Sequence, residues 1–380
     1  MRSQPRAILL AGILFLIVSA RPGRSAVLSS SDRTAVSGQV LISPLVFSAE
    51  NQQVSGLQFD LEWDQALDVK LVIGAQLRPS SKLLMTAAPQ NPRAIRCVVF
   101  GMDSLPIPEG ELLKAFLTVS PQASAGVARL RVTNTVATDP DGNSTPFAPA
   151  TVNVDIQNGA AASIALLQEG ILNAATLLPG PVSPGEIITL LGGLPAGDVS
   201  LFFNGIPAPV IYAGTNQVNA IVPFAADIGA PASLDVRIGE RSARMAVPVA
   251  PVGPGIFTQT GTGSGPGAIL NSDYSLNSAA NPAARGSFVM LFGTGFGGLD
   301  PQPADGTSVD AAIPTKLPVT ATVGGVPATV TYAGAAPGLI AGVVQINVQI
   351  PLDIPPNAAA SIVLSVGAVS TPAGVTLAIQ

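Results

Sequence analysis

An internal repeat in the second half of the chain constrains the fold more than any other feature. GIPAPVIYAG at residues 205–214 and GVPATVTYAG at 325–334 are identical at seven of ten positions. In the same order, IITLLG at 187–192 matches FVMLFG at 288–293, QVNAIVP at 217–223 matches QINVQIP at 345–351, and Ile-Leu-Asn opens both copies at 171–173 and 269–271. Such self-similarity is typical of one folding unit made twice, here of about 100 residues each.

Each repeat has the pattern of strands and turns. Its apolar residues are mostly Val, Ile, Leu and Ala, in short runs broken by glycine and proline, of which the chain holds 39 and 35. Short β-branched runs between turn residues predict strands rather than helices. NGIPA and GGVPA have the composition of hairpin turns between two strands. We therefore expect each repeat to form a small Ig-like sandwich.

The segment before the repeats, residues 33–156, also predicts strands. In VSGLQFDLEWD, Leu57, Phe59, Leu61 and Trp63 alternate with polar residues, as in a half-buried strand with one solvated face. Further strands are predicted in AIRCVVFGM, ELLKAFLTVS, ARLRVTNTVAT and ATVNVDI. Residues 1–160 carry 25 of the 41 charged residues, and QNGAAAS at 157–163 is predicted as a linker or domain edge. A two-sheet antiparallel sandwich is expected here.

The stretch VMLFGTGFGG contains Gly293, Gly295 and Gly298 in the spacing G-x-G-x-x-G. A dinucleotide-binding loop must open a helix, so that backbone N–H groups meet the pyrophosphate. LDPQPADG follows instead, with two prolines and no helical period. We interpret the glycines as a sharp exit from a sandwich strand and Phe296 as a packing anchor, and we expect no cofactor.

Acidic residues suggest two further sites, and both have a simpler interpretation. Asp60, Glu62 and Asp64 alternate on one strand, which favours a solvated sheet face over the facing carboxyl pair of a glycosidase. Asp139, Asp141 and Asn143 offer oxygen ligands for calcium, but DPDGN lacks the later glutamate of an EF-hand loop. A hairpin turn is the favoured interpretation, so no metal site is predicted.

Composition excludes several classes of chemistry. Histidine is absent, which removes Ser-His-Asp and Cys-His catalysis and most zinc sites. The one cysteine, Cys97 in IRCVVF, predicts a buried apolar residue and no intrachain disulfide. The net charge is −5 and no Lys/Arg-rich run exists, so nucleic acid is not an expected partner. We therefore predict no catalytic residues.

The N-terminus has the three parts of a secretory signal peptide. Arg2 and Arg6 precede an apolar stretch from Ala7 to Val18, and small residues follow up to Ala20 and again up to Ala26. Cleavage after either alanine is compatible with this pattern, and a retained anchor is the alternative. No membrane span is expected in the mature chain. These features predict a secreted or cell-surface protein.

Residues of the repeats resemble a known family. FVMLFGTGFG (288–297) and VTATVGGVPATVTYAG (319–334), ending at Pro351, resemble the IPT/TIG domain, an Ig-like fold. The first copy keeps IITLLGG and NGIPAPVIYAG but lacks the G-x-G-F-G form. With PVGPGIF at 251–257, the tandem pair over about residues 165–380 resembles an uncharacterised C-terminal domain of exported soil-bacterial proteins. This resemblance implies fold and location, but no activity.

The front segment resembles a cohesin module, the receptor half of the cohesin–dockerin pair. The resemblance lies in LQFDLEWDQALDV, with Trp63-Asp64 as its aromatic-Asp pair, in RCVVFGMDSLPIPEGELLKAFLTV (96–119), in ASAG (123–126) and in TDPDGNST (138–145). It implies a dockerin-type or polysaccharide-associated partner and a link to polysaccharide breakdown. Because such folds also resemble cellulose-binding sandwiches, a carbohydrate-binding or adhesion module without a dockerin partner remains the alternative.

Together these observations predict an all-β, exported, non-catalytic recognition or scaffolding protein. Its expected parts are a signal peptide (1–26), a cohesin-like or carbohydrate-binding-like sandwich (27–158) and two Ig-like repeats (159–258 and 259–380). The sequence does not identify the binding residues, since a sandwich face binds through a patch that only the fold assembles.

Overall fold

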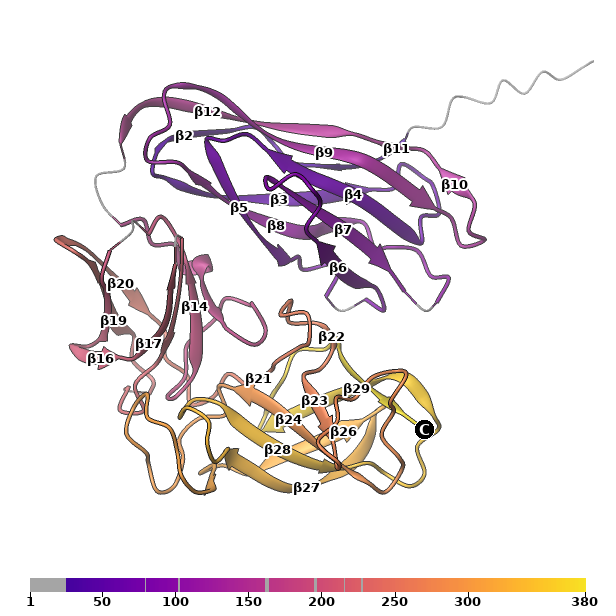
Figure 1. The fold of residues 1–380 in the computed structure, drawn as a ribbon, viewed down its shortest axis with the longest axis vertical. Helices are drawn as coiled ribbons and strands as arrows, with labels where there is room; N and C mark the ends of the chain where they lie inside the picture. Colours follow the sequence, from indigo (N-terminus) through magenta and orange to yellow (C-terminus); the bar gives the residue numbers. More distant parts are fainter. Residues whose placement is uncertain are drawn as a thin grey trace, which may run out of the picture.

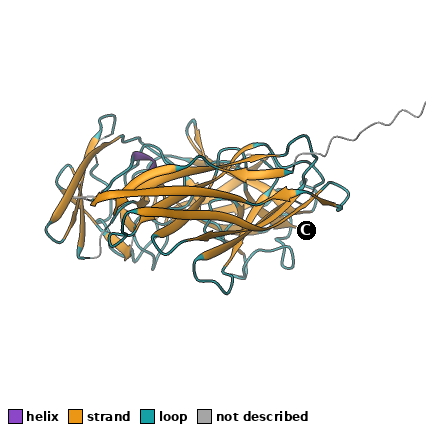
Figure 2. Ribbon diagram, turned by 90° about the horizontal axis from the view of Figure 1, so that it is seen from above, coloured by secondary structure: helices purple, strands orange, loops and turns teal. Residues whose placement is uncertain are grey.

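The computed structural model describes residues 25–78, 80–101, 103–160, 164–194, 197–214, 216–226 and 228–380. Within these ranges the regular structure is strand, together with one 3-10 turn, η1 (Gln168–Gly170), which confirms the predicted all-β class. Figure 1 shows three groups of strands, and Figure 2 shows the same strands from above. Residues 1–24, which hold nearly all of the predicted signal peptide, lie outside the described residues.

The first group, which we call the front sandwich, consists of two sheets formed by twelve strands. The first sheet has the order β11-β1-β3-β8-β5, and the second has the order β2-β12-β9-β4-β7-β6, with β10 added to β9. The strands are β1 (Ala26–Ser29), β2 (Arg33–Ser37), β3 (Val40–Ser48), β4 (Gly56–Trp63), β5 (Leu67–Ile73), β6 (Leu83–Ala87), β7 (Ala94–Phe100), β8 (Gly110–Val119), β9 (Gly126–Thr138), β10 (Ser144–Thr145), β11 (Phe147–Ala148) and β12 (Ala150–Ala160).

The core of the front sandwich follows the predicted alternation. Leu57, Phe59 and Leu61 are buried between the sheets, and Trp63 packs against the same core. The Phe59 ring meets Phe147 edge to face, with the ring centroids 6.2 Å apart. Residues 157–160 of the stretch predicted as a linker or domain edge form the end of β12, where Gln157 and Ala160 pair with β2.

The second group, which we call the first repeat, consists of η1 and eight strands in two four-stranded sheets. Their orders are β13-β14-β18-β17 and β16-β15-β19-β20. The strands are β13 (Ile171–Asn173), β14 (Ile187–Leu191), β15 (Val199–Phe203), β16 (Ile206–Ala208), β17 (Val210–Gly214), β18 (Gln217–Ile221), β19 (Ala232–Ile238) and β20 (Arg241–Val247).

The third group, which we call the second repeat, forms one folded sheet of eleven strands. Its main path is β21-β24-β28-β27-β26-β29-β31-β22. The strands are β21 (Gly255–Ile256), β22 (Gly265–Pro266), β23 (Ile269–Asn271), β24 (Phe288–Thr294), β25 (Ile313–Pro314), β26 (Val319–Val323), β27 (Val326–Ala335), β28 (Val344–Gln349), β29 (Asn357–Val366), β30 (Val369–Ser370) and β31 (Val375–Ile379).

One proline explains why the two repeats differ in sheet continuity. In the second repeat β27 runs unbroken and pairs with strands of both layers, β26 and β28. In the first repeat Pro209 stands where the second has Thr329, and the strand is divided there into β16 and β17. Proline has no backbone N–H to give to a ladder. The hairpin turn that precedes β16 and the one that precedes β27 have the predicted form, because Asn204-Gly205 and Gly324-Gly325 all have positive φ.

The first repeat covers one face of the front sandwich. Val40, Val72 and Phe116 project outward from the first sheet and form an apolar cluster with Leu172 and Leu191 of the first repeat. The contact has a polar edge, where Asn216 Nδ2 donates to Asp68 Oδ2 at 3.1 Å. The outer face of the sheet β11-β1-β3-β8-β5 is therefore partly occupied within the chain itself.

Candidate binding surface and interdomain cavity

The outward side of β6, β7, β4 and β9 forms the open face of the front sandwich; these strands lie side by side in the upper part of Figure 1. Across these strands the register places Met85, Val98, Gln58 and Val136 in one row. Met85 is 53% exposed and Val136 is 47% exposed. Val98 and Gln58 between them are half-buried, and because three of the four side chains are apolar we call this set the apolar row.

Asp60 corrects one expectation from the sequence. It was predicted on a solvated face, but it is only 3% exposed. Arg96 Nε and Nη2 donate to its two carboxylate oxygens at 2.7 and 2.8 Å, and Asn134 Nδ2 donates to Oδ2 at 2.7 Å. The hydrogen bond from Arg96 is the main cause that holds the pKa of Asp60 below its usual value. Asn134 reaches Asp60 from a bulge in β9, where its φ is +47°.

Glu62 and Asp64 also contact polar side chains of neighbouring strands on this face. Thr133 Oγ1 donates to Glu62 Oε1 at 2.9 Å, and Arg131 Nη1 lies 2.8 Å from Asp64 Oδ1. Each carboxylate therefore has its own partner, and the structure does not bring the three together as a facing acid pair. The open face thus combines the apolar row with charged side chains that are paired on the face itself.

Asp139, Asp141 and Asn143 lie together in the turn between β9 and β10. Asp139 Oδ1 accepts the backbone N–H groups of Asp141 and Asn143 at 3.0 and 2.8 Å, and Oδ2 accepts Asn143 Nδ2 at 3.0 Å. The side-chain hydrogen bond from Asn143 is the largest cause that lowers the pKa of Asp139. These contacts are those of an Asx turn. No group of three or more His, Cys, Asp or Glu side chains suited to a metal ion occurs in the described part of the chain.

Cys97 is buried on β7 beneath the open face. Burial raises the pKa of its thiol to about 12, so the reactive thiolate is disfavoured. The side chain acts as a small apolar core residue, as the sequence predicted.

The glycines of the G-x-G-x-x-G stretch let the backbone of the second repeat pack closely against the backbone of residues 253–255. Gly295 and Gly297 have φ of +80° and +83°, and Gly253 N donates to Gly295 O at 2.8 Å. A Cβ on Gly293 or Gly295 would overlap the carbonyl oxygen of Gly255 or Gly253. No helix follows in the described residues, and Phe296 is buried in the core, as predicted. The stretch is therefore a strand exit that serves packing.

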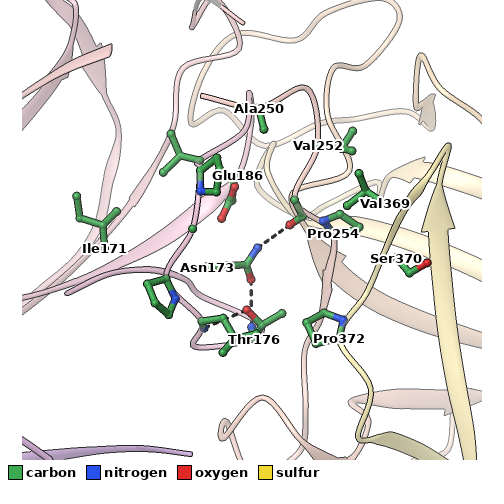
Figure 3. A pocket seen from close by; sticks show the side chains of 16 residues that line it. Ile171, Asn173, Thr176, Glu186, Ala250, Val252, Pro254, Val369, Ser370 and Pro372 are labelled. Carbon is green, nitrogen blue, oxygen red and sulfur yellow. Dashed lines mark hydrogen bonds between the residues drawn. The ribbon is translucent and has the colours of Figure 1, made fainter. Parts of the chain in front are cut away.

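A cavity of about 350 Å³ lies between the two repeats. Figure 3 shows Asn173 and Glu186 from the first repeat and Val369, Ser370 and Pro372 from the second around it. Its walls are largely aliphatic and include four prolines, Pro179, Pro181, Pro254 and Pro372. Asn173 Nδ2 donates to Gly253 O at 2.9 Å, so this amide joins the repeats at the cavity.

Glu186 is the one ionisable side chain among the described residues that line this cavity. Its Oε2 accepts hydrogen bonds from Ser183 N and Ser183 Oγ at 2.8 and 2.9 Å. Burial is the dominant effect and raises the pKa of the carboxyl to about 8. Glu186 is not among the residues predicted from the sequence. A local signal is present, since Ser-Pro-Gly-Glu at 183–186 has the Ser-x-x-Glu spacing in which the carboxylate accepts the serine N–H.

No known family model matches this sequence, and a search of curated proteins returns no match. Several solved structures that are similar to part of the chain are cohesins. A type I cohesin–dockerin complex from Clostridium thermocellum is 14% identical over 35% of this chain and 100% of the matched chain, with a TM-score of 0.30. A cohesin from Clostridium acetobutylicum is 18% identical over 36% and 94%, with a TM-score of 0.31. A non-cellulosomal cohesin from Archaeoglobus fulgidus is 18% identical over 36% and 94%, with a TM-score of 0.29.

Among the described residues, none of the helical structure has the length and apolar character needed to cross a bilayer.

Proposed function

We propose that this chain is an exported, non-catalytic recognition protein whose front sandwich binds a partner through its open face. The observation that carries the proposal is the unequal covering of the two sheets. The first repeat occupies part of the outer face of one sheet through Val40, Val72 and Phe116, whereas the other sheet keeps Met85 and Val136 exposed. The resemblance of the sequence to cohesins supports a dockerin-type protein as the partner.

Binding would proceed by burial of the open face, with no covalent chemistry. The apolar row would form the dry centre of the interface, and the paired charges around Asp60 and Asp64 would lie toward its rim. A standard interface buries roughly 800 Å² on each partner, which one sandwich face can supply. The repeats would then present the front sandwich at or outside the cell surface, consistent with their resemblance to IPT/TIG domains.

We expect Val136→Arg to weaken dockerin binding at least tenfold, or about 1.4 kcal/mol, because it replaces an exposed apolar side chain at the β9 end of the apolar row with a long charged one. Titration calorimetry of the full chain against a panel of dockerin modules measures the change. Val46→Arg is the matched control, since Val46 is 42% exposed but lies on β3 of the other sheet. Equal weakening by both variants, or by neither, would contradict binding at the open face.

The same proteins should be tested for binding to insoluble polysaccharides. Trp63, the single tryptophan of the chain, packs against the core of the front sandwich. A sugar platform needs exposed planar rings, and the exposed aromatic residues Tyr212, Tyr274 and Phe288 all lie in the repeats. We therefore expect the front sandwich to give no retention on cellulose or xylan. Retention on a polysaccharide without any dockerin binding would replace the proposal with the carbohydrate-binding alternative.

We also expect signal cleavage after Ala20 and not after Ala26. Ala26 is the first residue of β1, is fully buried and pairs with Phe147, and its N–H donates to Pro146 O at 3.0 Å. Cleavage after Ala26 would remove this residue from the sheet. Intact mass and the N-terminal peptide of the exported protein distinguish the two sites. A mature chain that begins at Val27 would contradict this prediction.

A further inference from the structure

The two repeats present the same sheet in the same register. In the first repeat the ladder joins Leu172 to Thr189, Thr189 to Asn219 and Asn219 to Tyr212. In the second repeat it joins Leu270 to Met290, Met290 to Asn347 and Asn347 to Tyr332. Even the amide contacts agree, because Gln217 Nε2 donates to Asn219 Oδ1 at 3.1 Å and Gln345 Nε2 donates to Asn347 Oδ1 at 2.8 Å. The two outer faces can therefore be compared residue by residue.

In the first repeat, this outer face is covered by other parts of the same chain. Leu172 and Leu191 are buried against Val40, Val72 and Phe116 of the front sandwich. At the other end of β14, the N–H of Ile187 donates to Thr294 Oγ1 of the second repeat at 2.7 Å. Ile187, Thr189 and Leu191, the outward residues of β14, are all buried.

In the second repeat the equivalent face is partly exposed, since Leu270, Met290 and Phe292 are half-buried, and its residues on β24 are larger. Phe288, Met290 and Phe292 stand where the first repeat has Ile187, Thr189 and Leu191. Phe288 is 41% exposed, and Leu276, which pairs with Leu270 at the end of the same row, is 49% exposed. A face that stays in water is normally polar on an antiparallel sheet, so these residues indicate that something covers it.

We propose that this face, formed by Leu270, Leu276, Phe288, Met290 and Phe292, binds the same face of a second copy of the chain. None of these residues is charged, and their neighbours Gln345, Asn347 and Gln349 on β28 carry amides that can both donate and accept. A two-fold axis would place identical groups opposite one another without like-charge repulsion. The front sandwich of the second copy is a poorer occupant, because the face that fits β14 is already covered by its own first repeat.

This inference goes beyond the recognition function and is tested separately from it. Sedimentation velocity of the full chain should show a dimer that dissociates on dilution, with a Kd below about 100 µM. Phe288→Glu should weaken self-association at least tenfold, because two carboxylates would be buried in the symmetric interface. Val46→Glu, at a position of matched exposure, should leave the dimer unchanged.

A mixing experiment separates loss of the interface from loss of the fold. Phe288→Glu and Phe288→Lys should each be monomeric alone, with the circular dichroism of the natural chain, and should form a heterodimer when combined. A natural chain that stays monomeric at about 100 µM would overturn the proposal. So would a dimer that survives Phe288→Glu, or one that is lost instead with Val136→Arg, which would place the contact at the open face. Dockerin titration of Phe288→Glu should match that of the natural chain.

Discussion

Gly295→Ala should lower the free energy of unfolding by about 4 kcal/mol or more. Gly295 has φ of +80°, a conformation that costs an alanine about 1 kcal/mol or more on its own. The added Cβ would also overlap the carbonyl oxygen of Gly253, whose N–H donates to Gly295 O. Backbone cannot move aside as a flexible side chain can, so the contact between residues 253 and 295 would be broken.

Two other glycine substitutions separate these causes, one in the first repeat and one close to Gly295. Gly205→Ala has the same positive φ but open space around its Cβ, so we expect a loss of only about 1 kcal/mol. Gly298→Ala has no positive φ and meets only the side chain of Lys316, so we expect almost no loss. Urea denaturation followed by circular dichroism measures all three. Similar midpoints for Gly295→Ala and Gly298→Ala would contradict the assigned role of this loop.

Glu186 should make the protein less stable as the pH rises from about 5 to 8. The buried carboxyl has a pKa of about 8 in the folded chain, against 4.5 for a glutamate in water. Between these values the folded state holds a proton that the unfolded state has released, so each rise in pH favours unfolding. The full effect is roughly 3 to 5 kcal/mol, present below about pH 4.5 and lost as the pH passes through 8.

Glu186→Gln should remove this slope, because an amide does not titrate in the range. At about pH 8 the variant should therefore unfold at the same or a higher urea concentration than the natural chain. Glu169→Gln is the control, since Glu169 is exposed in the same repeat and should leave the slope unchanged. If the natural chain and Glu186→Gln show parallel pH profiles, Glu186 is ionised in the folded state and the cavity is wetter than its walls indicate.

The fold could be predicted wherever the signal was local. Strands β4, β7, β8, β9 and β12 lie where alternating or β-branched runs predicted them, because the side-chain period of a strand is visible in the sequence. The two hairpins with Asn-Gly and Gly-Gly also follow from local turn chemistry.

The boundary between the two repeats could not be predicted from local signals. The sequence placed residues 251–257 in the first repeat, but Val252 and Ile256 lie in the core of the second.

The candidate sites could not be predicted in the same way. The alternation of LQFDLEWD correctly places Asp60 outward, but it cannot show that Arg96 and Asn134 come from two other strands to cover it. Likewise the exposure of Val136 depends on which sheet the first repeat covers. Glu186 left a local signal in Ser-Pro-Gly-Glu, but its burial depends on the contact between the two repeats.

By itself, the sequence determined an all-β chain, a repeated unit and a glycine-rich strand exit, because strand period, turn residues and self-similarity are properties of neighbouring positions. Only the tertiary structure decided which sheet faces are covered, since burial depends on segments far apart in the chain. The same outward row is buried in the first repeat, at Leu172 and Thr189, and only half-buried in the second, at Leu270 and Met290. The strands of the two repeats have the same order and register, so the difference in burial comes from packing against a neighbouring module.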